Sequence, residues 1–225
     1  FVWGLLLHLN SGHPSVTFGS VSSGRSSLLG IKNNEQLVGL CINTIPTCIA
    51  FDGTQSLLAQ LTSMQAREAE KLGYEVTPLI EIQRVLAEIS HKQMHTNEDF
   101  FQTLFVFENY PVEQISESSS LLKDFIGNEA PNYPLAIAAL AQKTLDISFT
   151  WDEFYYSESN IKQLMAQFER ITLQLLTTPE ARIQDLCLLS EQDKQQLLTQ
   201  FNHTRTSAFI IWFRSRQSSI QIRRP

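Results

Sequence analysis

The sequence predicts an α/β fold in which a mixed β-sheet is flanked by helices. Two apolar patterns support this prediction: short runs that alternate or stay apolar, as in strands, and longer runs with apolar residues at helical spacing. The two patterns interleave along the chain, and no internal repeat is present. With 225 residues, of which 43% are hydrophobic, the chain is long enough to bury a core. We therefore expect one domain or one large half-domain.

The first third of the chain contains short apolar segments followed by a helix. The segment 2–9 opens directly inside an amphipathic pattern with no capping residue ahead of it, so the chain looks cut from something longer. Strands are predicted at 16–21 and at 37–45, where the residues are apolar almost throughout. Apolar residues at helical spacing from Leu57 onwards predict a helix that ends near Gly73.

The middle of the chain predicts a helix and a central strand. Thr77 is a suitable N-cap and Pro78 a suitable first helical residue, which places a helix over 78–89. The run 100–111 is dense in phenylalanine and valine and is stopped by Pro111, a pattern that favours a central strand. We interpret its aromatic residues as core rather than as a ligand-stacking face.

The last third predicts a hairpin and the clearest helix. Strict alternation over 143–151 indicates a half-buried strand, paired as a hairpin with 134–140. The helix spans 160–176, and Ser190 with Asp193 resembles a capping box that opens a last helix. The apolar face of the 160–176 helix consists of Ile161, Leu164, Met165, Phe168, Ile171, Leu175 and Leu176.

Charge is divided unevenly along the chain. Residues 1–204 carry 12 basic and 23 acidic groups, a net charge of −11, whereas 205–225 holds five arginines and no acid. An acidic body without a basic stripe argues against nucleic acid as a partner. No apolar run approaches the roughly 18 residues of a membrane-spanning helix, and the opening residues lack the basic start of a signal peptide. These features predict a cytoplasmic protein with no membrane partner.

Cysteine and histidine spacing gives no metal or disulfide site. Cys41, Cys48 and Cys187 lack CxxC spacing and predict buried reduced thiols. His91 and His95 have the four-residue spacing that lets two imidazoles share a metal on one helix face. Lys92 stands where the metalloprotease motif needs glutamate, and no third ligand is evident, so we interpret both histidines as surface residues.

Two polar stretches interrupt the apolar pattern. The "SSGRSS" loop at 22–27 is too short for a phosphate-binding loop and lacks its GK[ST] ending. Asn43 and Thr44 continue an apolar run where polar side chains are costly. The residues alone leave two interpretations open: a functional pair, or an irregular strand end whose side chains satisfy nearby backbone groups.

Five segments in order resemble the C-terminal half of the condensation domains of nonribosomal peptide synthetases. They are "VTFGSVSSGR", "LVGLCINTIP", "TPLIEIQR", "LFVFENYP" and "LSEQDKQQLLTQFNHT", and the resemblance extends over roughly residues 1–204. The positions that match named family motifs are Ser23, Gly24, Arg25, Gly39, Leu40, Asn43 and Thr44.

This resemblance implies a fold and a set of partners. The family fold is similar to chloramphenicol acetyltransferase, with two α/β halves in a V and a tunnel between them. Peptidyl carrier proteins bring a donor and an acceptor on phosphopantetheine, and the acceptor amine attacks the donor thioester. No cofactor is then bound directly by this chain. The implied partners are carrier proteins, an N-terminal condensation half and an adjacent adenylation domain.

The resemblance also implies roles for the matched residues. Asn43 and Thr44 would end a strand near the interface between the halves, where they hold facing backbone or line the channel. The Ser23 to Arg25 stretch would lie near the tunnel, and the guanidinium of Arg25 would fix a carboxylate or carbonyl groups across the cleft. Many family members carry an arginine two residues beyond the proline of this motif, where this chain has Cys48.

The catalytic HHxxxDG motif of the family is absent from the sequence. No two of the five histidines, His8, His13, His91, His95 and His203, are adjacent. We therefore predict no catalytic residue and expect the chain to be inactive by itself.

Three regions are predicted from these observations. Residues 1–189 form the C-terminal condensation subdomain, 190–204 a linker toward an adenylation domain, and 205–225 a basic tail. The tail resembles no family segment, and we interpret it as disordered, out-of-frame sequence, a genuine basic tail being the alternative.

Two other functions stay open: a non-catalytic docking module for a carrier protein, and part of an epimerisation or cyclisation domain. A half-domain should also expose apolar surface.

Overall fold

The computed structural model describes residues 1–24, 38–90, 100–108, 132–141, 144–196, 198, 210–212 and 221–223. The chain divides into two compact units, Phe1–Leu186 and Cys187–Pro225. The second unit contains α6 (Glu191–Gln195) and an antiparallel pair of short strands, β6 (Ile210–Trp212) and β7 (Gln221–Arg223). The remaining elements belong to the first unit, which carries the candidate site.

A mixed five-stranded sheet forms the centre of the first unit, with strand order β2-β1-β3-β4-β5. The strands are β1 (Ser15–Ser22), β2 (Asn43–Ala50), β3 (Thr103–Glu108), β4 (Leu135–Ala141) and β5 (Leu145–Trp151). The three inner strands are mutually parallel, and the two edge strands run antiparallel to their neighbours. The predicted mixed α/β fold is therefore confirmed, with β3 at its centre and β4 and β5 as the predicted hairpin.

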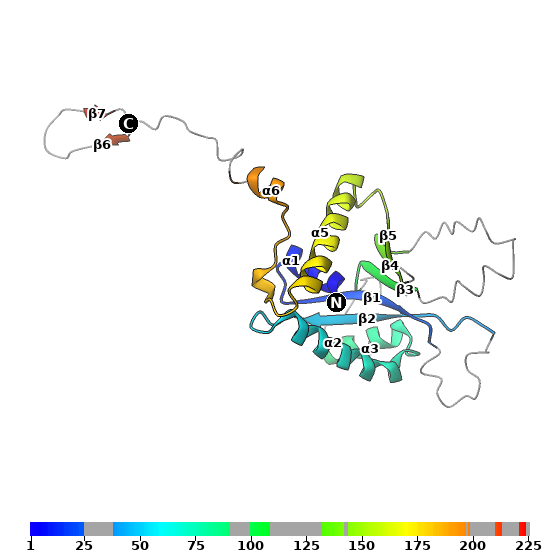
Figure 1. Ribbon diagram of the computed structural model, residues 1–225. Coiled ribbons are helices and arrows are strands. Elements are labelled where there is room, and N and C mark those ends of the chain that lie inside the picture. The colour runs from blue at the N-terminus through cyan, green and yellow to red at the C-terminus, as the bar shows by residue number, and fades with distance from the viewer. Residues whose placement is uncertain are drawn as a thin grey trace. The chain divides into compact units, whose positions relative to one another are not determined.

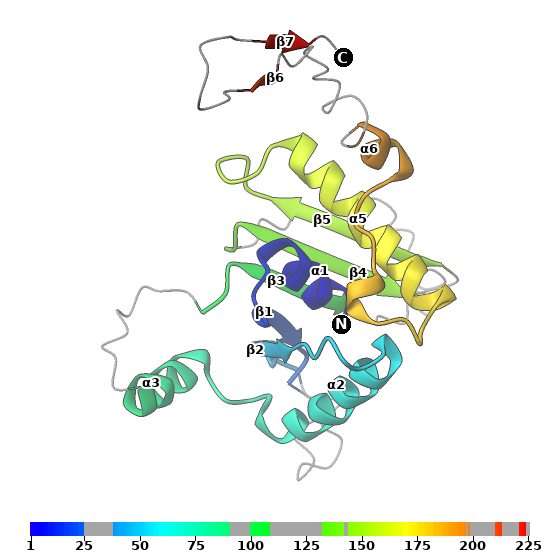
Figure 2. The same ribbon diagram turned by 90° about the vertical axis from the view of Figure 1, so that its left-hand side faces the viewer.

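Helices flank this sheet, as Figures 1 and 2 show. The helical segments are α1 (Val2–Ser11), α2 (Leu57–Lys71), η2 (Leu72–Tyr74), α3 (Leu79–Ser90), α5 (Glu158–Thr177) and η3 (Ile183–Asp185). Figure 2 shows α1 and α5 in front of the same face of the sheet, with α2 beside the edge strand β2. In the described residues, no helix is both long and apolar enough to cross a bilayer.

The core lies between the sheet and the helices α1 and α5. Gly4 lets α1 approach the sheet closely, since a Cβ there would lie 2.6 Å from the Ile49 side chain. The indole of Trp3 donates a buried hydrogen bond of 3.1 Å to the Thr103 hydroxyl, which links α1 to β3. On the same face, toward the other edge of the sheet, the Phe168 ring of α5 contacts the Phe149 ring of β5 edge to face.

The opposite face of the sheet carries a stripe of small and apolar side chains. Strand register places Gly19 next to Leu104, Leu104 next to Ala136 and Val106 next to Ala138. Phe101 covers Gly19, where a Cβ would lie 2.3 Å from the aromatic ring. The rest of the stripe is only half-buried in the described residues.

The predicted boundaries of β2 are wrong. The sequence predicts a strand at 37–45, with Asn43 and Thr44 at its end, but β2 begins at Asn43 and continues to Ala50. The strand therefore runs through Pro46, which has no N–H group to donate. This proline is tolerated because β2 is an edge strand, where one side of the backbone needs no partner.

Some predicted core positions are also exposed. Met165 and Leu176 belong to the predicted apolar face of α5, yet both lie on its exposed side, and Phe107 near the end of β3 is exposed as well. The three cysteines are free thiols, as expected, but none is buried. Cys48 is exposed because its side chain points away from α1, next to the hydroxyl of Thr17.

Candidate functional site

The candidate site lies where β1 ends and β2 begins. Ser22, the last residue of β1, pairs with Asn43, the first residue of β2. Ser23 and Gly24 follow directly after β1, and residues 38–42 lead into β2. The carboxyl ends of the parallel strands β1, β3 and β4 point to this same edge, which is where open α/β sheets usually place their binding sites.

Gly24 brings the two family-like motifs into contact. Its φ of 65° is in the left-handed region, and its N–H donates to the Ser22 hydroxyl at 3.1 Å. A Cβ on Gly24 would lie 2.1 Å from the backbone oxygen of Cys41, far inside van der Waals contact. Only glycine therefore fits this turn as it is built.

Asn43 ties the start of β2 to the connection between α2 and α3. Its Nδ2 donates to the carbonyl oxygens of Glu75 and Thr77, at 2.8 and 2.9 Å. Both protons of one amide are thus used on backbone that lies 32 and 34 residues further along the chain. These two hydrogen bonds explain the polar residue in an apolar run, because they satisfy two carbonyl groups that a leucine could not.

The other predicted site residues have less contact. Thr44 is half-buried and pairs with Val21 across the ladder. Gly39 has open space where its Cβ would be. Arg25 lies outside the described residues, as do His91 and His95, so their proposed roles stay predictions.

Exposed apolar side chains surround this end of the sheet. Leu40 and Ile42, just before Asn43, are 90% and 57% exposed. Tyr74 and Val76, in the segment that Asn43 holds, are 72% and 51% exposed. Single exposed apolar side chains are common, but several gathered in one place are typical of a surface that meets another protein part.

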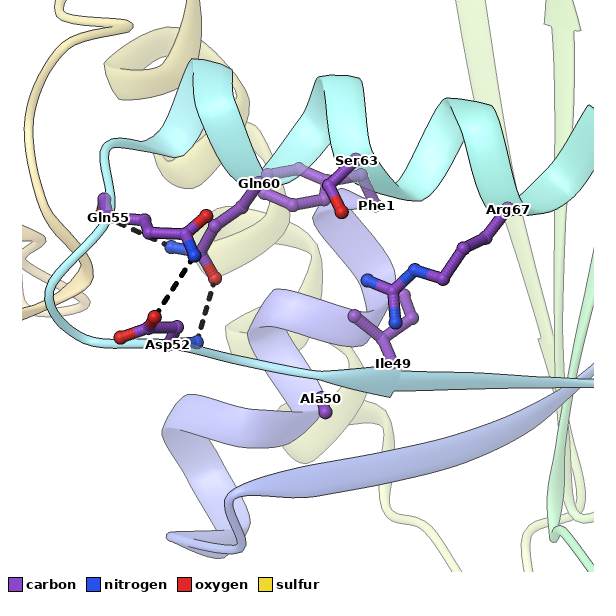
Figure 3. Close-up of a pocket in the computed structure, with 8 residues that line it drawn as sticks. All are labelled: Phe1, Ile49, Ala50, Asp52, Gln55, Gln60, Ser63 and Arg67. Carbon is purple, nitrogen blue, oxygen red and sulfur yellow. Dashed lines mark hydrogen bonds between the residues drawn. The ribbon is translucent and has the colours of Figure 1, made fainter.

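A small pocket lies elsewhere in the first unit, between α1, the end of β2 and α2 (Figure 3). Its volume is about 70 Å³, and none of the predicted site residues lines it. Gln60 accepts from the Asp52 N–H and donates to the Gln55 carbonyl, so its buried amide is used structurally. The Thr54 hydroxyl and N–H lower the pKa of Asp52 from its usual value. We assign no function to this pocket.

The described site residues can position groups but carry no proton-transfer chemistry. Serine, asparagine and threonine side chains donate and accept hydrogen bonds without titrating near neutral pH. In the described part of the chain, no three histidine, cysteine or acidic side chains gather as metal ligands. Any acid–base step would need titratable side chains other than these serine, asparagine and threonine residues.

Comparison with protein families gives a match over most of the chain. A family model described as the condensation domain matches residues 1–198. One component of the linear gramicidin synthase of Brevibacillus parabrevis is 32% identical over 206 residues, which are 90% of this chain and 2% of that protein. One component of the mycosubtilin synthase of Bacillus subtilis is 30% identical over 210 residues, 91% of this chain and 8% of that protein. The chain thus spans only a small part of these relatives.

Solved structures show the same fold. The first condensation domain of the CDA synthetase aligns with a TM-score of 0.63 at 17% identity, over 84% of this chain and 41% of that one. The starter condensation domain of the rhizomide synthetase aligns with a TM-score of 0.60 at 13% identity, over 84% of this chain and 43% of that one. The chain therefore spans about two-fifths of these two solved chains.

Proposed function

Because the chain belongs to the condensation-domain family, we propose that it forms the C-terminal half of a condensation domain in a nonribosomal peptide synthetase. The observation that carries this proposal is the meeting of two family-like motifs at one sheet edge, where Gly24 lies against Cys41 and Asn43 holds the facing backbone. The names of the relatives, which are synthases of linear gramicidin and mycosubtilin, support the same assignment.

In the proposed reaction, an acceptor amine attacks a donor thioester, and both are presented on the phosphopantetheine arms of carrier proteins. The HHxxxDG motif is absent from this sequence, so proton transfer belongs to an N-terminal half. This chain would supply one wall of the tunnel and hold it in shape through Gly24 and Asn43. Residues 190–204 would lead to an adenylation domain, and the assembly would work in the cytoplasm.

Exposed apolar surface supports a two-part domain. Leu40, Ile42, Tyr74 and Val76 surround the candidate site, and the half-buried stripe around Val106 lies on the sheet face opposite α1 and α5. Covering apolar area stabilises a contact by roughly 25 cal/mol per Å². An N-terminal half that docks here would remove this surface from water.

The first prediction concerns amide-bond formation. We expect no product from this chain alone, and product when residues 1–198 are joined to the N-terminal half of a related condensation domain that carries HHxxxDG. The assay supplies a donor aminoacyl carrier protein and an acceptor aminoacyl carrier protein, and intact-protein mass spectrometry detects the dipeptidyl carrier.

The matched control is the same hybrid with the second histidine of the HHxxxDG motif replaced by alanine, which should give no product. Product from this chain alone would contradict the proposal, and so would a folded hybrid that binds both carriers without joining their cargo. Carrier binding by this chain alone, with no product from the hybrid, would instead favour a docking module.

The second prediction concerns self-association. We expect the purified chain to form dimers or larger species in multi-angle light scattering, because Leu40 and Val76 leave apolar surface uncovered. Replacing both by lysine should shift the distribution toward monomer. Phe154, which is 86% exposed in the turn after β5 at the opposite sheet edge, provides the control, since Phe154→Lys should change little. A monodisperse monomer of the unmodified chain would count against the proposed two-part domain.

A further inference from the structure

A chain of polar side chains joins helix α2 to strands β2 and β1. The ammonium of Lys71, in the last turn of α2, donates to the Thr47 hydroxyl on β2 at 3.0 Å. The Thr47 hydroxyl is also hydrogen-bonded to the hydroxyl of Ser20 on β1. Thr47 is only 2% exposed. A hydroxyl buried this deeply is costly unless protein groups replace the water that it lost.

The donor of the bond between Lys71 and Thr47 can be assigned. An ammonium group has donors only, so the Thr47 oxygen must accept from Lys71. The proton of the second bond can lie on either hydroxyl, because a hydroxyl oxygen can accept two hydrogen bonds and donate one. In both arrangements two side chains satisfy the buried Thr47 hydroxyl, and the ammonium charge strengthens the bond that Thr47 accepts from Lys71. Glu68, 2.7 Å from the Lys71 ammonium, holds that ammonium in place.

These side chains link the two strands next to the candidate site. β2 is an edge strand, and in the described sheet its backbone pairs with β1. Ser20 follows Gly19 directly and lies three residues before Ser23, where the turn with Gly24 begins. Hydrogen bonds between side chains at this level therefore fix the two strands just before the candidate site.

We propose that Lys71, Thr47 and Ser20 are positioning residues that hold the carboxyl end of β1, and with it the Ser23–Gly24 turn, in register with β2. They contact no reacting group and act through the strand. The importance of the turn for catalysis rests on the proposed function, but the positioning itself can be measured in the full chain without any reaction.

The test is hydrogen–deuterium exchange measured by mass spectrometry on the full chain. Thr47→Val keeps the shape of the side chain and removes both hydrogen bonds. We expect amides in 20–24 to exchange roughly fivefold faster or more, as the loss of about one net hydrogen bond predicts. Thr47→Ser keeps the hydroxyl and should restore slow exchange. Lys71→Met should speed the exchange of the same amides, whereas Lys71→Arg, which can still donate to the Thr47 hydroxyl, should not.

Ser157→Ala separates local loosening from a general loss of stability. Ser157 forms the capping box at the start of α5, away from β1, so its loss should raise exchange along the whole first unit. The proposal is overturned if Thr47→Val raises exchange as uniformly as Ser157→Ala, if Thr47→Ser behaves like Thr47→Val, or if Lys71→Met changes nothing. None of these outcomes depends on amide-bond formation, so they leave the proposed function to its own test.

Discussion

Replacing Gly24 by alanine should lower the free energy of unfolding by about 2–4 kcal/mol and abolish product formation in the hybrid domain. Two costs add at this position. The φ of 65° disfavours any residue with a Cβ, and that Cβ would lie 2.1 Å from the Cys41 oxygen. The clashing atom belongs to the backbone, which cannot move aside as the end of a long side chain can. The turn must therefore move away from the segment before β2, and the contact with Cys41 is lost. Urea denaturation of the full chain measures the loss.

Gly12 provides a matched control for this substitution. Its φ of 70° is nearly the same as that of Gly24, but nothing lies within 4 Å of where its Cβ would be. Gly12→Ala should therefore carry only the backbone penalty, about 1–2 kcal/mol, and leave product formation unchanged. The difference between the two variants isolates the contact with Cys41. Equal losses, or an active Gly24→Ala hybrid, would show that the contact between the two motifs does not matter.

The elements that sequence reasoning placed well are those whose apolar pattern is strong and local. α5 repeats its apolar residues over five turns, and β5 alternates strictly, so both are predicted within a few residues of their bounds. β2 is misplaced because its proline is acceptable only on an edge strand, and edge position depends on how distant segments pair. Local patterns carry no information of that kind.

Part of the candidate site could likewise be predicted from the sequence, and part could not. The polar residue at 43 stands out as an anomaly, but its partners lie 32 and 34 residues away and no spacing rule points to them. The hydrogen bond from Lys71 to Thr47 joins residues that are 24 positions apart, and it could not be predicted from the sequence. A lysine at the C-terminal end of a helix is ordinarily explained by the helix dipole. The family resemblance identified the motif residues, and the structure identified the groups that they contact.

Replacing Asn43 by aspartate should cost about 2–4 kcal/mol of unfolding free energy, although the two side chains have the same shape. The amide donates to two carbonyl oxygens, and a carboxylate cannot donate to either. The variant thus loses both hydrogen bonds, leaves the Glu75 and Thr77 carbonyls without this donor, and places a negative charge against them. We expect α3 to loosen, with faster hydrogen exchange in 79–89 than the global loss explains, and product formation in the hybrid to fall.

Asn10 tests whether the position of the amide in the fold, rather than the chemistry of the change, sets this cost. Its Nδ2 also donates twice, to the Leu6 carbonyl and the Gln167 side chain, but Asn10 is exposed. Water can reach the exposed Asn10 side chain, and the Gln167 amide can turn its NH2 group toward a carboxylate, so Asn10→Asp should cost no more than about 1 kcal/mol and leave α3 exchange unchanged. If Asn43→Asp were equally mild, the two hydrogen bonds to the α2–α3 connection could not be what holds this end of β2. The amide in the apolar run would then need another explanation.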